Sequence, residues 1–495
     1  MVVDVPIRDP GRSTARARSH TPDTARPLTT TVGTVDRMST LDAEFLHLED
    51  DTSHMHIAGI STFADPAPTF EEVTALVASK LHLIPRYRQR VRTVPLELGR
   101  PVWVDDPHFN LEYHVRHTAL PSPGSDADLC RLMGRLMSQP LDRGRPLWEV
   151  WLVEGLSDGR WALVFKVHHC MVDGIAGVGL LTVMLDLDPD AELPEAPPWS
   201  PGRQPSGPEL VLDAWQGAVA DTARWLGRTP ALLHHPLDAA RQAAELGTGF
   251  ARLGSHLVNT PRSSIEGSIG PHRVWCHASV ELPEVKRIGK ALGGTVNDVV
   301  LAAVTGGYRS LLEERGDDPA TTVVRSLVPV SVRASNATND TDNRVSALFL
   351  ELPVALTDPV GRLQAVRTAM EGLKGSHIAE AGEVVTAIGN LAPPPVVGSV
   401  TRLGLRAQHL FSQRSITTVT TNVPGPQFPV YCLGREMQEY LPFVPVSYGV
   451  RVGTAILSYN GNLAFGITGD WDTAADVDVL AAGIIAGIDE LSAVC

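Results

Sequence analysis

From residue 38 onward, apolar and polar positions alternate between strand-like and helix-like patterns. Two apolar-rich stretches of strand length, 147–153 and 161–167, lie on either side of an Asp-Gly pair, which is a strong hairpin signal. The stretch 174–185 contains no charged residue and predicts a deeply buried helix. A second block, from about residue 273 to the end, again mixes helices with strand-like stretches, at 323–332, 347–352 and 464–468. The pattern therefore predicts a mixed α/β fold.

Changes in composition divide the chain into four parts. Residues 1–37 are rich in Thr, Pro and Arg and predict a disordered lead, with Met38 as a candidate for the true start. We expect an N-terminal domain over 38–187, a Pro-rich linker with a helical crossover over 188–265, and a C-terminal domain over 266–495. Two α/β halves of similar size are thus expected.

Charge and cysteine usage exclude several classes of protein. The 495 residues include 42 Lys and Arg against 56 Asp and Glu, a net charge of −14, so we expect no nucleic-acid partner. The five scattered cysteines form no Cys-X-X-Cys pair, which argues against a disulfide framework and against a metal site. The longest uncharged stretch, 384–401, contains three consecutive prolines that would break a membrane-spanning helix. We expect a cytoplasmic protein with at most peripheral membrane contact.

The strongest candidate for chemistry directly follows the stretch 161–167. The chain reads HHCMVDG over 168–174, an HHxxxDG pattern, whereas the other pair, His234-His235, lacks both the Asp and the Gly. A histidine at the end of a strand projects between two layers, where a neutral imidazole can accept a proton from a hydroxyl. The alternative is that His168 and His169 are two structural core histidines.

Two further residues of the pattern shape the loop. Asp173 lies four residues after His169, and Gly174 permits a turn that a Cβ would hinder. Asp173 either accepts a hydrogen bond from the imidazole or pairs with an arginine that braces the loop. We favour the brace, with Arg333 as the partner.

The HHxxxDG pattern resembles the active-site motif of the CoA-dependent acyltransferase superfamily, which includes chloramphenicol acetyltransferase and peptide-synthetase condensation domains. Three further stretches resemble the bacterial wax ester synthase/acyl-CoA:diacylglycerol acyltransferases. They are PLD at 140–142 with PLWE at 146–149, TVNDVVL at 295–301 and NVPGP at 422–426. The resemblance implies two chloramphenicol-acetyltransferase-like α/β domains with mixed sheets and an active-site channel at their interface.

The resemblance also implies the reaction. A fatty acyl group passes from acyl-CoA to diacylglycerol, which gives triacylglycerol, or to a long-chain alcohol, which gives a wax ester. Acyl-CoA is then a co-substrate, and no cofactor or protein partner is expected. The family's general base is the second histidine, which maps to His169, while His168 orients the loop or the first substrate.

The other motif residues each leave two interpretations open. Asn297 precedes an apolar helix, so its amide either donates to the oxyanion of the tetrahedral intermediate or only caps the helix; Asp298 follows it and is included in the candidate site. The stretch Pro146-Leu147-Trp148 packs a strand or shapes the acyl channel. The stretch 422–426 indicates a rigid turn.

Two departures from the family pattern bear on acceptor preference. Glu266 stands where an asparagine is expected, and Thr421 stands where a serine is usual. A cationic stretch is also notable: from 384 to 435 the chain has no Asp or Glu but contains Arg402, Arg406, Arg414 and Arg435. This stretch either meets an anionic bilayer or lipid droplet, guides CoA phosphates, or is an ordinary buried segment. A second basic run, over 86–92, is predicted to be a solvated edge.

Rival functions remain at this point. The sequence GLSDG at 155–159 fits the serine-hydrolase pattern, but it lies between two predicted strands rather than on a strand–turn–helix elbow. Cys170 is a weak candidate for a nucleophile, because transfer from a thioester needs no covalent intermediate. A catalytically silent acyl-CoA-binding or lipid-droplet protein, or a transferase for another hydroxylated acceptor, are the alternatives.

Overall fold

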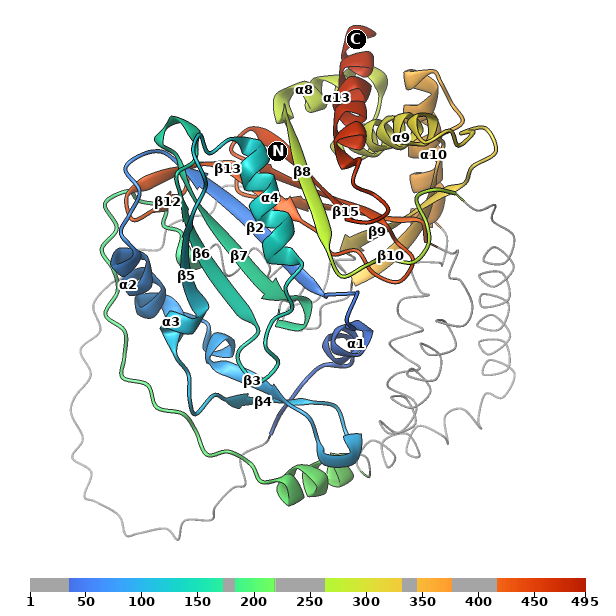
Figure 1. Ribbon diagram of the computed structural model, residues 1–495. Coiled ribbons are helices and arrows are strands. Elements are labelled where there is room, and N and C mark those ends of the chain that lie inside the picture. Colours follow the sequence, from blue (N-terminus) through green and yellow to red (C-terminus); the bar gives the residue numbers. More distant parts are fainter. Residues whose placement is uncertain (1–34, 172–182, 218, 220–262, 332–344, 376–415) are drawn as a thin grey trace, which may run out of the picture. The chain divides into compact units, whose positions relative to one another are not determined.

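The computed structural model describes residues 35–171, 183–217, 219, 263–331, 345–375 and 416–495 (Figure 1). Several predictions concern residues outside these ranges: those on Asp173, Gly174, Arg333 and the His234-His235 pair, and on nearly all of the helix expected at 174–185. The first described strand is β1 (Asp36–Arg37), which pairs with Trp103 and Val102, so the prediction of a disordered lead is wrong for these last two of its residues.

One six-stranded sheet carries the histidine motif. Its strand order is β12-β13-β2-β7-β6-β5, and only β5 and β6 run parallel. The strands are β2 (His56–Phe63), β5 (Val115–Ala119), β6 (Trp148–Glu154), β7 (Trp161–His168), β12 (Tyr431–Cys432) and β13 (Arg435–Phe443). A separate three-stranded sheet contains β1, β4 (Val102–Asp105) and β3 (Gln89–Arg92).

The predicted hairpin between β6 and β7 is confirmed. The two strands pair antiparallel from Trp148↔Val167 to Val153↔Ala162, and the connection contains a short 3₁₀ turn, η4 (Ser157–Gly159). Asp158 and Gly159 have φ values of 62° and 72°, the left-handed conformation that an Asp-Gly pair adopts readily. Ser157 therefore belongs to a hairpin turn and not to a nucleophile elbow.

The second six-stranded sheet has the order β10-β9-β11-β14-β15-β8. Strand β11 runs parallel to both of its neighbours and the other pairs are antiparallel, so this sheet is mixed as well. The strands are β8 (Arg273–Glu281), β9 (Val324–Ser331), β10 (Val345–Leu352), β11 (Thr418–Pro424), β14 (Val452–Tyr459) and β15 (Asn462–Asp470). The strands expected at 323–332, 347–352 and 464–468 are thus present.

Strands β12 and β13 show a connection that the linear pattern does not reveal. Both come from the C-terminal half of the sequence, yet β13 pairs with β2, with Phe443 opposite Ala58 and Met437 opposite Phe63. Sequence periodicity predicts that a segment is a strand, but the strand it pairs with depends on packing against apolar residues that are distant in the sequence.

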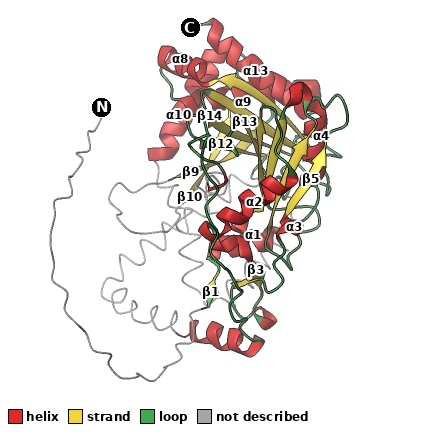
Figure 2. Ribbon diagram, turned by 90° about the vertical axis from the view of Figure 1, so that its left-hand side faces the viewer, coloured by secondary structure: helices red, strands yellow, loops and turns green. Residues whose placement is uncertain are grey.

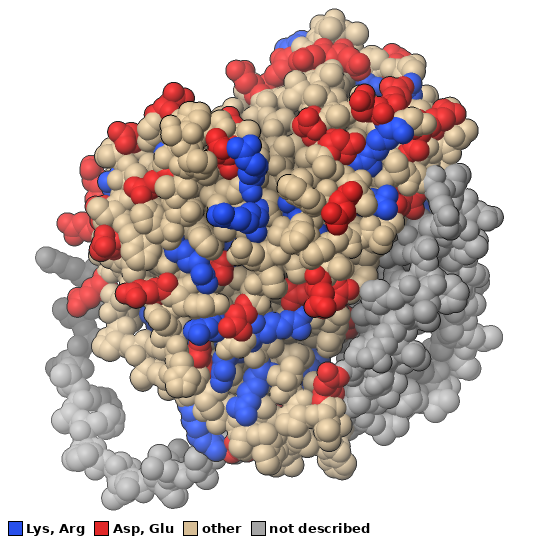
Figure 3. Space-filling view, in the orientation of Figure 1, with Lys and Arg blue, Asp and Glu red and all other residues tan. Residues whose placement is uncertain are grey.

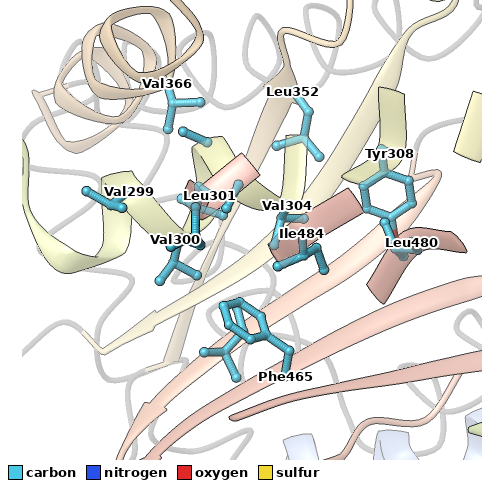
Figure 4. Packing of buried hydrophobic residues seen from close by; sticks show 14 of the residues in the cluster. Val299, Val300, Leu301, Val304, Tyr308, Leu352, Val366, Phe465, Leu480 and Ile484 are labelled. Carbon is cyan, nitrogen blue, oxygen red and sulfur yellow. The ribbon is translucent and has the colours of Figure 1, made fainter. Parts of the chain in front are cut away.

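Helices cover the second sheet and fill the space beside the first. Helices α8 (Leu282–Leu292), α9 (Val296–Glu314), α10 (Pro359–Gly375) and α13 (Val477–Ala493) gather on one side of the second sheet (Figure 2). Their apolar side chains form one buried cluster with that sheet, including Val300, Val304, Phe465 and Ile484 (Figure 4). Burial of this hydrocarbon is the main stabilising term for the second half.

Helix α4 (Asp126–Met137) packs where strands of the two sheets meet. Its Leu132 and Met133 share one buried cluster with Val164 of β7 and Trp275 of β8. The remaining described helices of the first half are α1 (Thr40–Leu48), α2 (Phe70–Lys80) and α3 (Leu111–His114).

On the face drawn in Figure 3, acidic and basic side chains lie side by side over much of the surface. Among the described residues, no helix is both long enough and apolar enough to span a membrane.

Candidate active site

The histidine motif begins at the last residue of β7. His168 ends the strand opposite His56 of β2, and His169 opens a 3₁₀ turn, η5 (His169–Met171). The backbone N–H of His169 donates to the carbonyl of Met55 over 2.8 Å. The turn is therefore fixed to the neighbouring strand, and the two adjacent histidines point into different environments.

His168 is completely buried, and its hydrogen bonds define its tautomer. The backbone N–H of Cys170 donates to His168 Nδ1 over 3.1 Å, so Nδ1 is the nitrogen without a proton and Nε2 carries one. His168 Nε2 lies 3.5 Å from Oε2 of Glu49. The ring also meets the ring of His56 edge-on, with 5.8 Å between the centroids. These contacts fit the loop-orienting role of His168, which remains a prediction, as does its alternative of orienting the first substrate.

His169 is only partly buried, and its role as a base remains a prediction. Its ring stacks on Phe45, with a centroid separation of 4.0 Å, and its buried Nδ1 has no hydrogen-bond partner. Burial lowers the pKa of His169 to about 4, because the charged imidazolium loses its hydration. The ring is therefore neutral at pH 7, the protonation state that can accept a proton from a hydroxyl.

Glu49 contacts the first histidine of the motif, and no sequence pattern singles it out. It directly follows α1, its side chain is 8% exposed, and its Oε1 lies 3.2 Å from Nε2 of His56. Arg143 donates to Oε2 of Glu49 through Nε at 2.9 Å and Nη2 at 2.6 Å. Burial opposes ionisation of this carboxyl, but contacts with His168 and His56 outweigh it and lower the pKa of Glu49 far below its ordinary value. Glu49 is therefore an anion between two imidazoles and a guanidinium.

His54 and His56 are further site residues that sequence reasoning missed. Both are buried, His54 two residues before β2 and His56 as its first residue, and their rings stack with 5.7 Å between centroids. Their spacing of two residues, which is typical of side chains on one face of an extended chain, was a usable signal. Burial lowers the pKa of His56 to about 3, so it stays neutral beside Glu49.

Asn297 is not the cap of its helix. Thr295 is the N-cap of α9, and its side chain accepts from the backbone N–H of Asp298. Asn297 Oδ1 instead accepts a hydrogen bond from Nδ2 of Asn422 over 3.2 Å, which brings the TVNDVVL and NVPGP stretches together. This bond uses the amide oxygen of Asn297 and leaves its NH₂ group as a donor. The interpretation of Asn297 as a helix cap is wrong, and the oxyanion role stays a prediction.

Asp298 is placed by local structure. Its Oδ2 accepts hydrogen bonds from the backbone nitrogen and Oγ1 of Thr295, at 2.8 and 2.7 Å, which completes a capping box. Gly425 of the NVPGP stretch sits where a Cβ would lie 2.3 Å from the carbonyl oxygen of Ser458, so β11 can approach β14 only without a side chain. Within the described part of the chain, no hydrogen bond or ring contact joins His169 to Asn297 or Asn422.

The stretch Pro146-Leu147-Trp148 belongs to the core of the first half. Leu147 and Trp148 are at most 1% exposed, and Trp148 Nε1 donates to the carbonyl of Tyr87 over 2.7 Å. The Trp148 ring stacks on His114 at 4.5 Å. These contacts support the packing interpretation, and a role in an acyl channel remains a prediction.

The other candidate groups have structural contacts. Cys170 is buried, and desolvation raises the pKa of its thiol, which argues against a thiolate nucleophile. The basic run over 86–92 is not only a solvated edge. Arg88 lies over the ring of Trp199, and Arg92 donates to the carbonyl of Pro205, so both arginines contact the Pro-rich linker. Of the predicted cationic stretch, Arg435 is described and donates to the carbonyls of Pro66 and Leu433. Among the described side chains, no group of three or more His, Cys, Asp or Glu is arranged to hold a metal ion.

Two family models match the chain in order. The wax ester synthase/diacylglycerol acyltransferase catalytic domain matches residues 38–300, and the C-terminal domain of the same family matches 341–492. The chain belongs to this family. The resemblance that the motifs indicated is thereby confirmed.

Individual relatives and solved structures agree with this assignment. The probable diacylglycerol O-acyltransferase tgs1 of Mycobacterium tuberculosis is 37% identical over 465 residues, which cover 93% of this chain and 96% of that protein. A putative diacylglycerol O-acyltransferase of Mycobacterium bovis matches to the same extent. The wax ester synthase/diacylglycerol acyltransferase from Marinobacter aquaeolei has a TM-score of 0.64 at 26% identity, over 92% of this chain and 99% of that one.

A more distant match concerns the fold alone. The first condensation domain of the calcium-dependent antibiotic synthetase has a TM-score of 0.56 at 15% identity, over 93% of this chain and 96% of that one. The two-domain α/β class with mixed sheets and the class of acyl-CoA-dependent O-acyltransferase are confirmed, whereas the interface channel remains a prediction.

Proposed function

We propose that this chain transfers a fatty acyl group from acyl-CoA to the hydroxyl of diacylglycerol or of a long-chain alcohol, with His169 as the general base. The observation that carries the proposal is the environment of His169. It is a neutral, partly exposed imidazole on a fixed turn, in the motif position that the resemblance assigns to the general base. The mycobacterial relatives are named for transfer to diacylglycerol, and the Marinobacter structure also for wax ester synthesis.

The proposed mechanism needs one proton carrier. His169 accepts the proton of the acceptor hydroxyl while the oxygen attacks the thioester carbonyl. The resulting oxyanion is stabilised by the NH₂ group of Asn297, whose amide oxygen is held by Asn422. The intermediate collapses with cleavage of the C–S bond, and the imidazolium returns its proton to the CoA thiolate. The products are an ester and free CoA, and no covalent acyl-enzyme is formed.

The test is release of CoA thiol from palmitoyl-CoA in three parallel reactions, with diacylglycerol, with hexadecanol and with no acceptor. We expect release that depends on an alcohol, together with the corresponding ester by lipid chromatography. Release without any acceptor would indicate a thioesterase, and no release in any reaction would indicate the catalytically silent binding protein. Either of these results would refute the proposal.

Peripheral contact with a lipid surface is proposed for the same chain, because both acceptors are lipids. The stretch 384–435 supports it, since it contains arginines and no acidic residue in a protein of net charge −14. Flotation with anionic liposomes should be weakened when Arg402, Arg406 and Arg414 are all changed to Glu. Unchanged flotation of this variant would remove the idea.

A further inference from the structure

We propose that Glu49 is a positioning residue of the acyl transfer, which acts on the proposed base through His168 and the backbone of the motif turn. The inference rests on the proposed function of His169. It concerns a carboxylate that lies outside the HHxxxDG motif, about 120 residues earlier in the sequence.

The first step is the contact between Glu49 and His168. Neutral imidazole has two tautomers, and a histidine without partners exchanges between them. The carboxylate of Glu49 lies 3.5 Å from His168 Nε2, where its negative charge attracts a proton carried by that nitrogen and by no other atom of the ring. An anion at this place therefore favours the Nε2–H tautomer of His168 and disfavours the other, as carboxylates do for histidines in other sites.

The second step leads from His168 to the turn. With its proton on Nε2, His168 presents an unprotonated Nδ1, which accepts the N–H of Cys170 over 3.1 Å. This bond spans His169 and joins the side chain at the end of β7 to the backbone of η5. In the other tautomer a proton on Nδ1 would face the N–H of Cys170, two donors would meet in a buried place, and the turn that carries His169 would shift.

The third step is what keeps Glu49 charged in a buried position. Arg143 donates twice to Oε2 of Glu49, and its Nη2 also donates to the carbonyl of Leu46 at the end of α1, over 2.9 Å. A buried carboxylate with these contacts is held in one orientation, whereas an unpaired one would be strongly unfavourable. Arg143 lies between the PLD and PLW stretches, which gives this part of the sequence a role besides packing.

The kinetic test compares Glu49→Ala and Glu49→Gln with the full-length wild type. Loss of the acceptor in Glu49→Ala should lower kcat about 10- to 100-fold, as removal of a partner that orients a functional histidine does, with KM for palmitoyl-CoA nearly unchanged. Glu49→Gln keeps an oxygen that can accept from His168 Nε2–H, so its kcat should recover to within about tenfold of wild type. Asp476→Asn is the matched control: it removes a carboxylate that pairs with Arg315 where α13 begins and α9 ends, and should leave kcat unchanged.

A spectroscopic test separates positioning from simple stabilisation and does not depend on activity. In protein labelled with ¹⁵N-histidine, two-bond proton–nitrogen correlations report the tautomer, and the His168 signal is assigned from its loss in His168→Gln. We expect a single Nε2–H tautomer in wild type and in Glu49→Gln, and a mixture in Glu49→Ala. The inference is overturned by unchanged kcat in Glu49→Ala, or by an unchanged His168 tautomer in that variant. If wild type transferred no acyl group, the proposed function would fail while the tautomer result still decided the role of Glu49.

Discussion

The end of β7 and the start of α9 both present polar side chains next to an apolar core, but they hold them by different means. At the end of β7, His168 is fully buried and depends on Glu49, which lies in a distant segment. At the start of α9, the capping box joins Thr295 to Asp298, three residues apart. The proposed base is thus supported by long-range contacts, whereas Asn297 lies at a helix end that is stabilised by its own sequence.

Substitution of the proposed base at the end of β7 should have the largest effect on activity. His169→Ala removes the group that accepts the hydroxyl proton, so we expect kcat to fall about 10²–10⁴-fold. The ring is partly exposed and packs on one side against Phe45, so the fold should be retained. Steady-state CoA release and circular dichroism measure the two quantities. Near-normal turnover by a folded variant would show that another group takes the proton.

Substitution in the hydrogen-bonded pair of amides, Asn297 and Asn422, should have the next largest effect on kcat. Asn297→Ala removes the proposed oxyanion donor and should lower kcat about 10²–10³-fold, the usual cost of one such donor. Asn422→Ala should cost less, because Asn422 acts by holding the oxygen of Asn297 and not by touching the substrate. Measurement of kcat for both variants under saturating substrates checks this order. If Asn422→Ala cost more than Asn297→Ala, Asn422 would be the donor.

Acidification should lower the free energy of unfolding, because buried histidines near β7 resist protonation in the folded state. Burial lowers the pKa of His56 to about 3 and that of His114 to about 4, from an ordinary value of 6.5. As the pH falls below 6.5, the unfolded chain binds these protons first, so the free energy of unfolding should decrease from pH 6.5 down to about pH 4. Each histidine contributes at most about 1.4 kcal/mol per pH unit in that window. Urea unfolding at several pH values should show a smaller slope for His56→Asn than for wild type; an equal slope would place the titrating groups elsewhere.

Removal of the capping box at the start of α9 should have the smallest effect. Thr295→Ala removes the side chain that caps α9 and should lower the free energy of unfolding by about 1 kcal/mol. Because Thr295 is placed at the helix end and not in the proposed chemistry, kcat should stay within a factor of two or so of wild type. Thermal unfolding and CoA release test the two statements together. A large loss of kcat would mean that the helix end and the amide pair are coupled.

Local patterns in the sequence predicted what depends on near neighbours. The hairpin at Asp158-Gly159, the strand that ends at His168 and the apolar face of α9 all follow from periodicity and turn chemistry. The motif order also indicated the family correctly. These features require no knowledge of which distant segments meet.

Features that depend on distant partners were not predictable in the same way. No spacing rule connects Glu49 to His168 or places Arg143 beside it, because these contacts form only when α1, β7 and the PLD–PLW segment fold together. The pairing of β13 with β2 is of the same kind. A helix cap was one of the two interpretations left open for Asn297, but the Thr-X-X-Asp signature at 295–298 indicates Thr295 as the cap, as the structure shows.

The central claim is that the acceptor hydroxyl attacks the thioester directly while His169 takes its proton. A rapid-quench experiment with stoichiometric palmitoyl-CoA tests it, with CoA release and the intact mass of the protein followed with and without hexadecanol or diacylglycerol. We predict that wild type releases CoA only when an alcohol is present, that no acylated protein forms, and that His169→Gln loses the alcohol-dependent release. A stoichiometric burst of CoA without alcohol, together with acyl protein, would contradict the account.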